Sequence, residues 1–318
     1  MKGGFLVVVV GGIYPMKKGF CFAVASAFLL SLMNLFVKVL GNYHMAPPLP
    51  SSEIAFFRGL IGSIAVLAYM RCKGIQFSKQ DRGLLVMRGL YGGVAMLFNF
   101  IALIYMKMSD ASILFQLSGI FVFIFSALFL KERIPKGSAI WLILIFVAVM
   151  VMVNPFGYSA AFGWPALIAI LGAALSAAAY ATIRSISKHG RHSSFEIMAY
   201  FMIAGMVAGI VGMCTFQTFI MPDMIQWGYI IGIGAISIVA QFFLTGAFIT
   251  TNAVVAQFLQ YIGVFFSSFF GFVVFDERLA ISTVIAGVVM FIASVMLARL
   301  KEGSKVVEGK VIEDRKAK

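Results

Sequence analysis

Residues 94–133 read VAMLFNFIALIYMKMSDASILFQLSGIFVFIFSALFLKER, and residues 239–278 read VAQFFLTGAFITTNAVVAQFLQYIGVFFSSFFGFVVFDER. The two stretches align without a gap at a constant offset of 145 residues and share 11 identities over 40 positions. Apolar sequences match by chance, but the Glu-Arg pair that ends both stretches is polar, so lipid-facing composition does not explain it. The match indicates an internal duplication.

The composition of this 318-residue chain excludes a water-soluble globule. Hydrophobic residues make up 62% and charged residues 12%, against about 45–50% and about 25% in soluble domains, and the mean hydropathy is +1.01. A spanning helix needs about 20 apolar residues, so the length fits about ten spans joined by short loops. The runs are continuously apolar, whereas strands of a membrane β-barrel alternate polar and apolar residues. The sequence therefore predicts an all-α integral membrane protein with ten transmembrane helices.

Apolar runs between breakers place these spans. They are residues 19–39, 53–70, 84–105, 110–130, 137–153, 164–184, 195–215, 226–247, 252–275 and 281–299. The offset of the duplication covers five spans, and an odd number inverts the second copy in the membrane. We therefore predict two inverted five-helix repeats, residues 19–153 and 164–299. Transporters often use this architecture, because two similar inverted halves can open a midplane site to either side.

The distribution of lysine and arginine predicts the orientation, because cytoplasmic segments retain an excess of both. With the N-terminus inside, the inside segments contain 20 of these residues and the outside segments contain two, Lys107 and Arg278. The other three lie within predicted spans: Lys38, Arg58 and Arg88. Both termini are thus expected in the cytoplasm of a multi-pass protein of the bacterial inner membrane. The same excess accounts for most of the net charge of +13, so we predict no nucleic-acid partner.

The two ends of the chain lie outside the predicted repeats. Residues 1–18 form an N-terminal segment, and its first 15 residues, with the apolar run from Phe5 to Ile13, are too short to span the membrane. Met16 followed by two lysines resembles a natural start, and we hypothesise that translation begins there; the alternative is a short membrane-surface segment. Residues 300–318 are charged and lack apolar periodicity, which predicts a disordered cytoplasmic tail.

Several segments resemble a known family. Phe57-Arg58-Gly59, the segment Arg88-Gly89-Leu90-Tyr91-Gly92-Gly93 and the Glu-Arg pairs that close spans four and nine, together with the duplication, are similar to the drug/metabolite transporter superfamily, EamA type. The resemblance covers about residues 19–299 and implies a permease in which the first four helices of each repeat surround a central cavity. Family members often have a proline early in the fourth helix of each repeat. This chain has Gly119 and Val264 there, so no proline kink is expected.

Polar side chains within the spans are the candidate substrate-binding residues, because polar groups in hydrocarbon usually face the bundle interior or a wet cavity. On span four Ser112 and Gln116 share one helix face, and the offset places Gln257 and Tyr261 at matching positions of span nine. We predict that Gln116, Gln257 and Tyr261 line one cavity. The further candidates are Asn34, Arg58, Tyr91, Asn99, Ser176, Tyr180 and Gln241. Hydrogen bonding between helices is the alternative role for each.

Arg58 allows two interpretations. Its forked guanidinium could bind a substrate carboxylate or phosphate. The role that we favour is structural, with the side chain reaching the outer interface or pairing with Asp110 or Glu53. Arg88 has the same ambiguity on the cytoplasmic side, where the expected partners are Asp81 or Glu132.

These features favour a transporter of a small organic metabolite that works by alternating access. The cargo would be an amino acid, a nucleotide-related metabolite or an amphiphilic drug, as the family resemblance implies. An intramembrane enzyme and an ion channel are the alternatives. We predict no catalytic residue, metal site or cofactor, because the three histidines lie in loops, the three cysteines lack metal spacing and Gly-x-Ser-x-Gly is absent. Partners are the substrate and membrane lipid. The sequence does not decide transport direction, the coupling ion or whether the protein is a homodimer.

Overall fold

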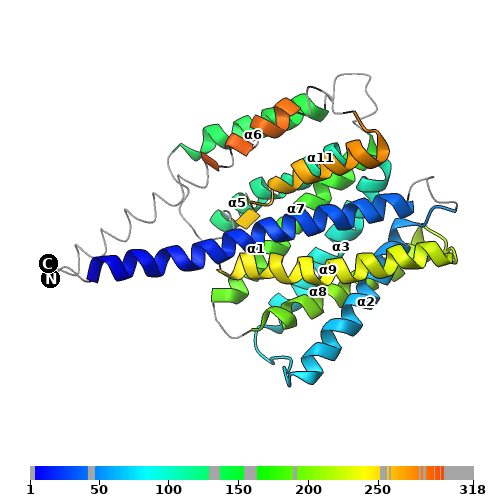
Figure 1. Cartoon of the computed structure of the whole chain (residues 1–318), viewed down its shortest axis with the longest axis horizontal. Coiled ribbons are helices and arrows are strands. Elements are labelled where there is room, and N and C mark those ends of the chain that lie inside the picture. The colour runs from blue at the N-terminus through cyan, green and yellow to red at the C-terminus, as the bar shows by residue number, and fades with distance from the viewer. Residues whose placement is uncertain are drawn as a thin grey trace.

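A computed structural model shows the chain as a bundle of helices (Figure 1). The structure describes residues 4–41, 47–128, 137–153, 163–188, 192–250, 256–257, 259–278, 281, 284–289, 291–293 and 295–296, and these contain no strand. The helices are α1 (Gly4–Gly41), α2 (Ser51–Cys72), α3 (Arg82–Tyr105), α4 (Met108–Gln116), α5 (Ser118–Leu128), α6 (Ser138–Val153), α7 (Trp164–Lys188), α8 (Ser194–Thr215), α9 (Met224–Thr250) and α11 (Ile262–Phe275).

The chain is an all-α, multi-pass membrane protein, as the sequence predicted. Seven segments among the described residues are long and apolar enough to cross a membrane: Gly19–Gly41, Ser51–Cys72, Arg82–Tyr105, Met108–Phe125, Trp164–Ser187, Ser194–Thr215 and Met224–Thr250. Two shorter apolar helices follow, Ile262–Phe275 and Val284–Ala293. Helix α1 begins well before the expected start at residue 19. The count of ten spans stays a prediction, and the predicted tail at 300–318 lies outside the described residues.

The fourth predicted span is interrupted, which the sequence did not predict. Helix α4 ends at Gln116 and α5 begins at Ser118, so residues 110–130 do not form one continuous helix. In the ninth predicted span, Gln260 and Tyr261 form a turn immediately before α11. Neither interruption contains a proline. A run of apolar residues predicts that a segment lies in lipid. It does not predict where a helix is interrupted, because that depends on side chains of neighbouring helices that can replace backbone hydrogen bonds.

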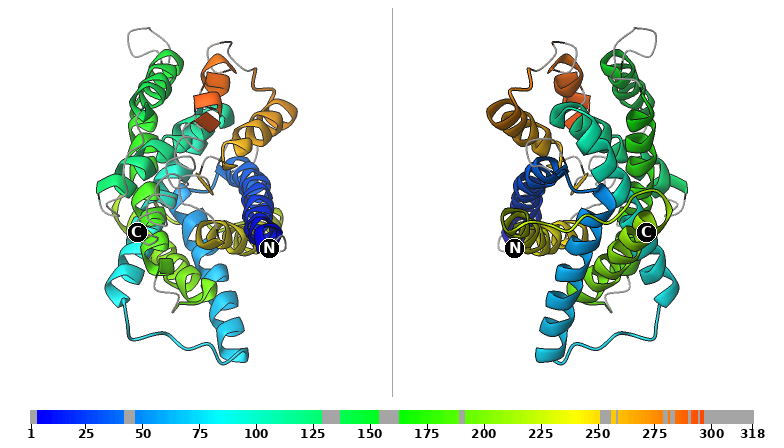
Figure 2. Two further views of the ribbon diagram at one scale, coloured as in Figure 1. Left: turned by 90° about the vertical axis from the view of Figure 1, so that its left-hand side faces the viewer. Right: turned by 90° about the vertical axis from the view of Figure 1, so that its right-hand side faces the viewer.

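Three close helix pairs hold the bundle together. Helix α1 packs along α9, α3 packs along α7, and α2 packs along α8. Figure 1 shows α1 and α9 side by side, and the end-on views of Figure 2 place α2 and α8 on the side of the bundle away from α6. Glycines permit the α2–α8 contact: a Cβ on Gly59 would collide with the backbone of Met206, and one on Gly209 with the backbone of Phe56. Small residues allow such close approach of helices in membranes.

An ion pair connects several helices at the end of the bundle where α3 ends. Lys38 pairs with Glu277, and its ammonium also donates a 2.7 Å hydrogen bond to the carbonyl of Met106. The second carboxylate oxygen of Glu277 accepts a 2.8 Å hydrogen bond from the backbone N–H of Met108. These four residues, here called the Lys38 cluster, join α1 to the α3–α4 connection and to the end of α11.

A second cluster of contacts lies at the end of the bundle where α3 begins. Glu196 accepts a 2.8 Å hydrogen bond from the backbone N–H of Ser78, and its other oxygen lies 2.9 Å from Nδ1 of His192. The Nε2 atom of His192 lies 3.5 Å from a carboxylate oxygen of Asp81. These four residues form the Glu196 cluster, which joins the α2–α3 connection to the start of α8. Helix α3 contains 24 residues, so the two clusters are separated by about 36 Å at 1.5 Å per residue.

Candidate functional site

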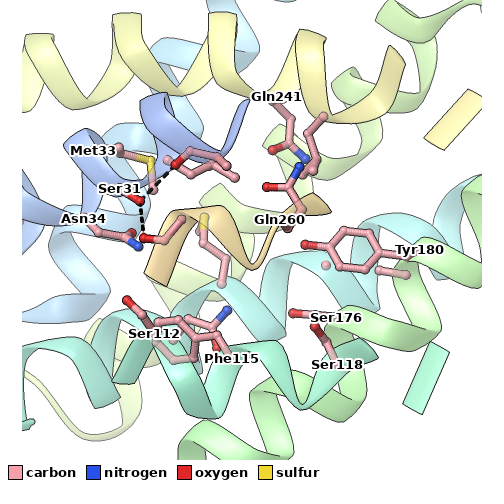
Figure 3. A pocket seen from close by; sticks show the side chains of 18 of the residues that line it. Ser31, Met33, Asn34, Ser112, Phe115, Ser118, Ser176, Tyr180, Gln241 and Gln260 are labelled. Atoms are coloured by element: carbon pink, nitrogen blue, oxygen red, sulfur yellow. Dashed lines mark hydrogen bonds between the residues drawn. The ribbon is translucent and has the colours of Figure 1, made fainter. Parts of the chain in front are cut away.

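A cavity of about 150 Å³ lies between α1, α2, α3, α4, α5, α7, α8, α9 and α11. Figure 3 shows Asn34 of α1, Gln241 of α9 and Tyr180 of α7 with their side chains pointing into the same space. Eight of the ten predicted binding residues line it: Asn34, Arg58, Asn99, Gln116, Ser176, Tyr180, Gln241 and Gln257. The structure thus brings most of the polar candidates together, and their role in binding stays a prediction.

Two predicted residues lie away from this central cavity. Tyr261 lines a second, mostly apolar cavity of about 340 Å³, which Gln116 also borders. Its hydroxyl points at the backbone of α4, because the turn before α11 interrupts the helix face on which the prediction relied. Tyr91 lies half-buried on α3 and lines neither of these two cavities. Arg88 and Gly92 lie on the side of α3 that faces the cavity. Tyr91 lies between them in the sequence but on a different face of the helix.

The two helix interruptions contact each other through side chains. The hydroxyl of Tyr261 donates a 2.8 Å hydrogen bond to the carbonyl of Gln116, and the Gln116 amide donates a 2.7 Å bond to the carbonyl of Gln260. The amide of Gln257 donates to the Gln116 side-chain oxygen at 3.1 Å and to the Ser118 hydroxyl at 2.8 Å. Gln116 and Gln257 therefore line the cavity and also form the interhelical hydrogen bonds that were the alternative interpretation.

Sequence reasoning missed Gln260, which lines the cavity as well. Its amide donates to the carbonyl of Ala23 at 3.1 Å and to the hydroxyl of Ser26 at 2.7 Å, which anchors the turn before α11 to α1. The repeat offset pairs Gln260 with Phe115, so comparison of the two repeats gave no polar signal at this position. Ser31 makes a related contact, because its hydroxyl donates to the carbonyl of Gly263 at 3.0 Å.

The structure places Arg58 in the central cavity. The side chain is buried, contacts the sulfur of Met96, and lies with its Cζ 5.7 Å from the ring centre of Phe100 and 5.2 Å from that of Phe201. Among the described residues, no carboxylate lies within 4.0 Å of the guanidinium. The expected pairing with Asp110 or Glu53 was therefore wrong; one carboxylate oxygen of Glu53 accepts a 3.0 Å hydrogen bond from the backbone N–H of Ile220.

Arg88 joins Arg58 at the same aromatic ring. Its Cζ lies 4.5 Å from the ring centre of Phe201, and the side chain is buried. A Cβ on Gly92 would collide with this guanidinium, so the glycine provides the space that the arginine fills. Asp81, an expected partner of Arg88, approaches His192 instead, and Glu132 lies outside the described residues. The sequence placed the two arginines on opposite sides of the membrane and gave no sign that they meet.

Several polar atoms at the cavity are buried and make no hydrogen bond within the described structure. They are Nε of Arg58, Nε of Arg88, Oδ1 of Asn99, Oγ of Ser112 and Oε1 of Gln257. Buried polar groups are nearly always bonded to protein or water, because an unbonded group loses its hydration without compensation. The cavity therefore offers both donors and acceptors to a polar occupant. Among the described residues, its lining contains no histidine, cysteine, aspartate or glutamate. The described part of the chain also contains no group of three or more such residues that could hold a metal.

Comparison with known proteins gives a consistent family. The profile of the EamA-like transporter family matches residues 17–154 and 164–299. The pseudopaline exporter CntI of Pseudomonas aeruginosa is 35% identical over 290 residues, which cover 91% of this chain and 98% of the exporter.

More distant relatives are also transport proteins by name. Solute carrier family 35 member G1 of Homo sapiens is 25% identical over 275 residues, covering 81% of this chain and 73% of the carrier. A riboflavin transporter of Brucella anthropi is 23% identical over 259 residues, covering 80% of this chain and 90% of that protein. A solved crystal structure has a similar fold, with a TM-score of 0.63, 17% identity, and coverage of 90% of this chain and 98% of the other.

Proposed function

The chain belongs to the EamA-like transporter family, and from this premise we propose that it moves its cargo by alternating access through the central cavity. It is a multi-pass membrane transporter of small metabolites. In the proposed mechanism, two inverted five-helix repeats rock against each other and expose the cavity first to one side and then to the other. The Lys38 cluster and the Glu196 cluster form the gates at the two ends.

The observation that carries this proposal is the pair of interrupted helices at the cavity. Transporters of the inverted-repeat type commonly build their substrate sites from discontinuous helices near the membrane midplane. Here the interruption after Gln116 and the turn at Gln260 and Tyr261 lie at positions related by the offset of 145 residues. Each interruption borders the cavity, and each is bonded to the other.

The helix contacts support the inverted arrangement. Exchanging each helix for its counterpart in the other repeat turns the contact of α1 with α9 into that of α7 with α3, and both contacts occur. The α2–α8 crossing is also unchanged when each helix is exchanged for its counterpart in the other repeat. Gly59 meets Met206 and Gly209 meets Phe56, and a shift of 150 residues converts Gly59 into Gly209 and Phe56 into Met206.

We propose repeat boundaries at residues 19–153 and 164–299, ten spans in all, and both termini in the cytoplasm of a bacterial inner membrane. The two intervals matched by the family profile support the boundaries. The excess of basic residues in alternate segments supports the orientation. The names of the relatives favour transport over an intramembrane enzyme, and the described residues of the cavity lining include no acidic residue or histidine.

Counterflow in proteoliposomes tests the function. Vesicles preloaded with one unlabelled compound are given the same compound in labelled form, from a panel of amino acids, nucleosides, pseudopaline and riboflavin; the last two are taken from the names of the relatives. We expect at least one compound to accumulate transiently, as a carrier requires. Ser112→Trp, which fills the cavity, should abolish this exchange. Ile64→Trp, at a side chain of α2 that is 61% exposed, is the matched control and should not.

Accumulation that is identical with and without Ser112→Trp would contradict the cavity as the route, and unitary currents in planar bilayers would identify a channel.

The inverted repeats need a separate test. Single cysteines at Lys131 and Asp276 are labelled in a chain whose three native cysteines have been replaced. We expect them to react with an impermeant reagent from opposite faces of the membrane; reaction from the same face would overturn the mechanism.

A further inference from the structure

We propose that the cavity recognises an organic anion, whose carboxylate or phosphate group is held between Arg58 and Arg88 and whose remainder presents hydrogen-bond donors to Asn99 and Gln257. This inference rests on the proposed function only in assuming that the cavity is the cargo site. It names a class of cargo that neither the fold nor the names of the relatives specify.

The positions of the two guanidinium groups carry the proposal. Both lie at the ring of Phe201, with Cζ 5.2 Å from its centre for Arg58 and 4.5 Å for Arg88. The arginines are only 2% and 1% exposed, respectively. The Nε atom of each has no hydrogen-bond partner among the described residues. Two like charges held this close and this deep repel each other, and their aromatic contact compensates only part of the lost hydration.

The described residues of the cavity supply no counter-charge. They include these two arginines and no aspartate or glutamate. The ion pair of Lys38 with Glu277 and the contacts of His192 with Asp81 and Glu196 involve neither arginine. Buried charges are normally paired, so the missing partner is supplied by what the cavity binds. The guanidinium fork matches the planar carboxylate and the phosphate in geometry.

The arginines are not part of the framework that the repeats share. The glycines of the α2–α8 crossing and the paired helix interruptions recur in both halves. The shift of 150 residues that relates α2 to α8 converts Arg58 into Ala208, and the offset of 145 converts Arg88 into Ile233. A packing role required by the repeat would recur in the second copy. The positive charge is therefore a property of the site, contributed by the first repeat alone.

The neutral polar atoms complete the recognition pattern. Oδ1 of Asn99 and Oε1 of Gln257 are buried acceptors without a donor among the described residues. A Cβ on Gly172 would lie 2.6 Å from Oδ1 of Asn99, so this glycine leaves room for the amide. An acceptor can be satisfied only by an N–H or O–H group. The cargo class that fits both sets of atoms is an amino- or hydroxy-substituted organic acid, or its phosphate counterpart.

Binding measurements on the full-length protein in lipid nanodiscs test this class without relying on transport. The probes are glutamate and malate for carboxylates, glycerol 3-phosphate for phosphates, glutamine and glucose as neutral compounds, and spermidine as a cation. We expect anions alone to raise the apparent melting temperature in a saturable manner. The carboxylate and phosphate arms then show which of the two groups the site prefers. If no anion in the panel binds, or if neutral or cationic probes bind equally well, the proposal is overturned.

Three variants locate the binding site. Arg58→Gln and Arg88→Gln should each weaken binding of the effective anion by about tenfold or more, as loss of a charged hydrogen bond implies, while Arg71→Gln should not. Arg71 lies exposed at the end of α2 and controls for the same change of net charge. In the absence of anions, both cavity variants should melt at a higher temperature than the parent, because an unpaired buried charge is removed. Lower melting temperatures together with unchanged anion binding would show that the arginines are structural and would overturn the proposal.

The two proposals fail separately. Anion binding that depends on both arginines, without counterflow of any bound compound, would retain the anion site and contradict the transport mechanism. Counterflow of a neutral or cationic compound that is unaffected by Arg58→Gln and Arg88→Gln would retain the transport mechanism and overturn the anion site.

Discussion

The hydroxyl of Tyr261 donates a 2.8 Å hydrogen bond to the backbone carbonyl of Gln116, and the repeat offset makes these two residues counterparts of one another. Gln116 is the last residue of α4, so its carbonyl has no partner further along that helix. Its side chain in turn donates to the carbonyl of Gln260, the residue before Tyr261. Each interruption therefore satisfies a backbone group of the other, which fixes the two helices together at the cavity.

Tyr261→Phe removes only the hydroxyl and leaves the carbonyl of Gln116 without this bond. Because Tyr261 is 2% exposed, water is not available as a ready replacement. We expect the free energy of unfolding to fall by about 1–3 kcal/mol, measured as a lower thermal unfolding temperature in nanodiscs. Tyr105→Phe is the matched control, because Tyr105 is 58% exposed at the end of α3. Equal stability of the two variants would contradict a structural role for the bond.

The α2–α8 crossing gives a second prediction, in which the same substitution has opposite effects at two glycines. Gly59→Ala places a Cβ against the backbone of Met206, which cannot move without separating the helices. Overpacking of this kind costs about 1–3 kcal/mol. Gly228→Ala, on an open face of α9 with no atom within 4 Å, should stabilise the helix by about 0.5–1 kcal/mol. Thermal unfolding of both variants in nanodiscs checks the sign, and a Gly59→Ala variant as stable as the parent would show that the crossing is looser than described.

Hydropathy predicted the membrane-crossing helices because burial in lipid depends mainly on composition and length. The bounds of α2, α3, α7, α8 and α9 lie within a few residues of the predicted spans. The internal match at 145 residues also predicted that Gln116 and Gln257 line one cavity, as they do. Apolar length and internal similarity are properties of single segments or of pairs of segments, so they can be read from the sequence alone.

The remaining details depend on how segments meet. A helix interruption without proline leaves no local signal, so the turn that redirects Tyr261 was missed. The proximity of Arg58 and Arg88 was not predicted, because the depth of each residue in the membrane was estimated from the ends of its own helix. In the structure, both side chains reach the ring of Phe201. Phe201 itself was one of 33 phenylalanines. Its importance depends on two neighbours that are distant in the sequence.

The gate that we propose at the end of α3, formed by the Lys38 cluster, gives a further prediction. Glu277→Gln leaves the buried ammonium of Lys38 without its counter-charge, and breaking a buried ion pair in this way costs about 3–5 kcal/mol. We expect the closed gate to open more often. A cavity cysteine at Ser176, introduced into a chain whose native cysteines have been replaced, should react faster with an impermeant maleimide applied at the face where α3 ends.

The double variant Lys38→Met and Glu277→Gln is the control for that prediction, because it removes the unpaired charge as well as the pair. It should recover part of the thermal stability that Glu277→Gln loses. Full loss in the double variant would indicate that Glu277 acts through the backbone N–H of Met108 and not through Lys38.

The Glu196 cluster should control access from the opposite face. Glu196 is 2% exposed and holds Ser78 and His192 through separate carboxylate oxygens, which ties the α2–α3 connection to the start of α8. Glu196→Ala removes both contacts, and we expect the cysteine at Ser176 to react faster with maleimide applied at the face where α3 begins. The reaction from the other face should slow, because opening one side of an alternating-access carrier lowers the population that is open to the other. Glu277→Gln provides the reciprocal comparison, with the two rates changed in the opposite sense. Faster reaction from both faces in either variant would mean that the gates open independently, which alternating access does not allow.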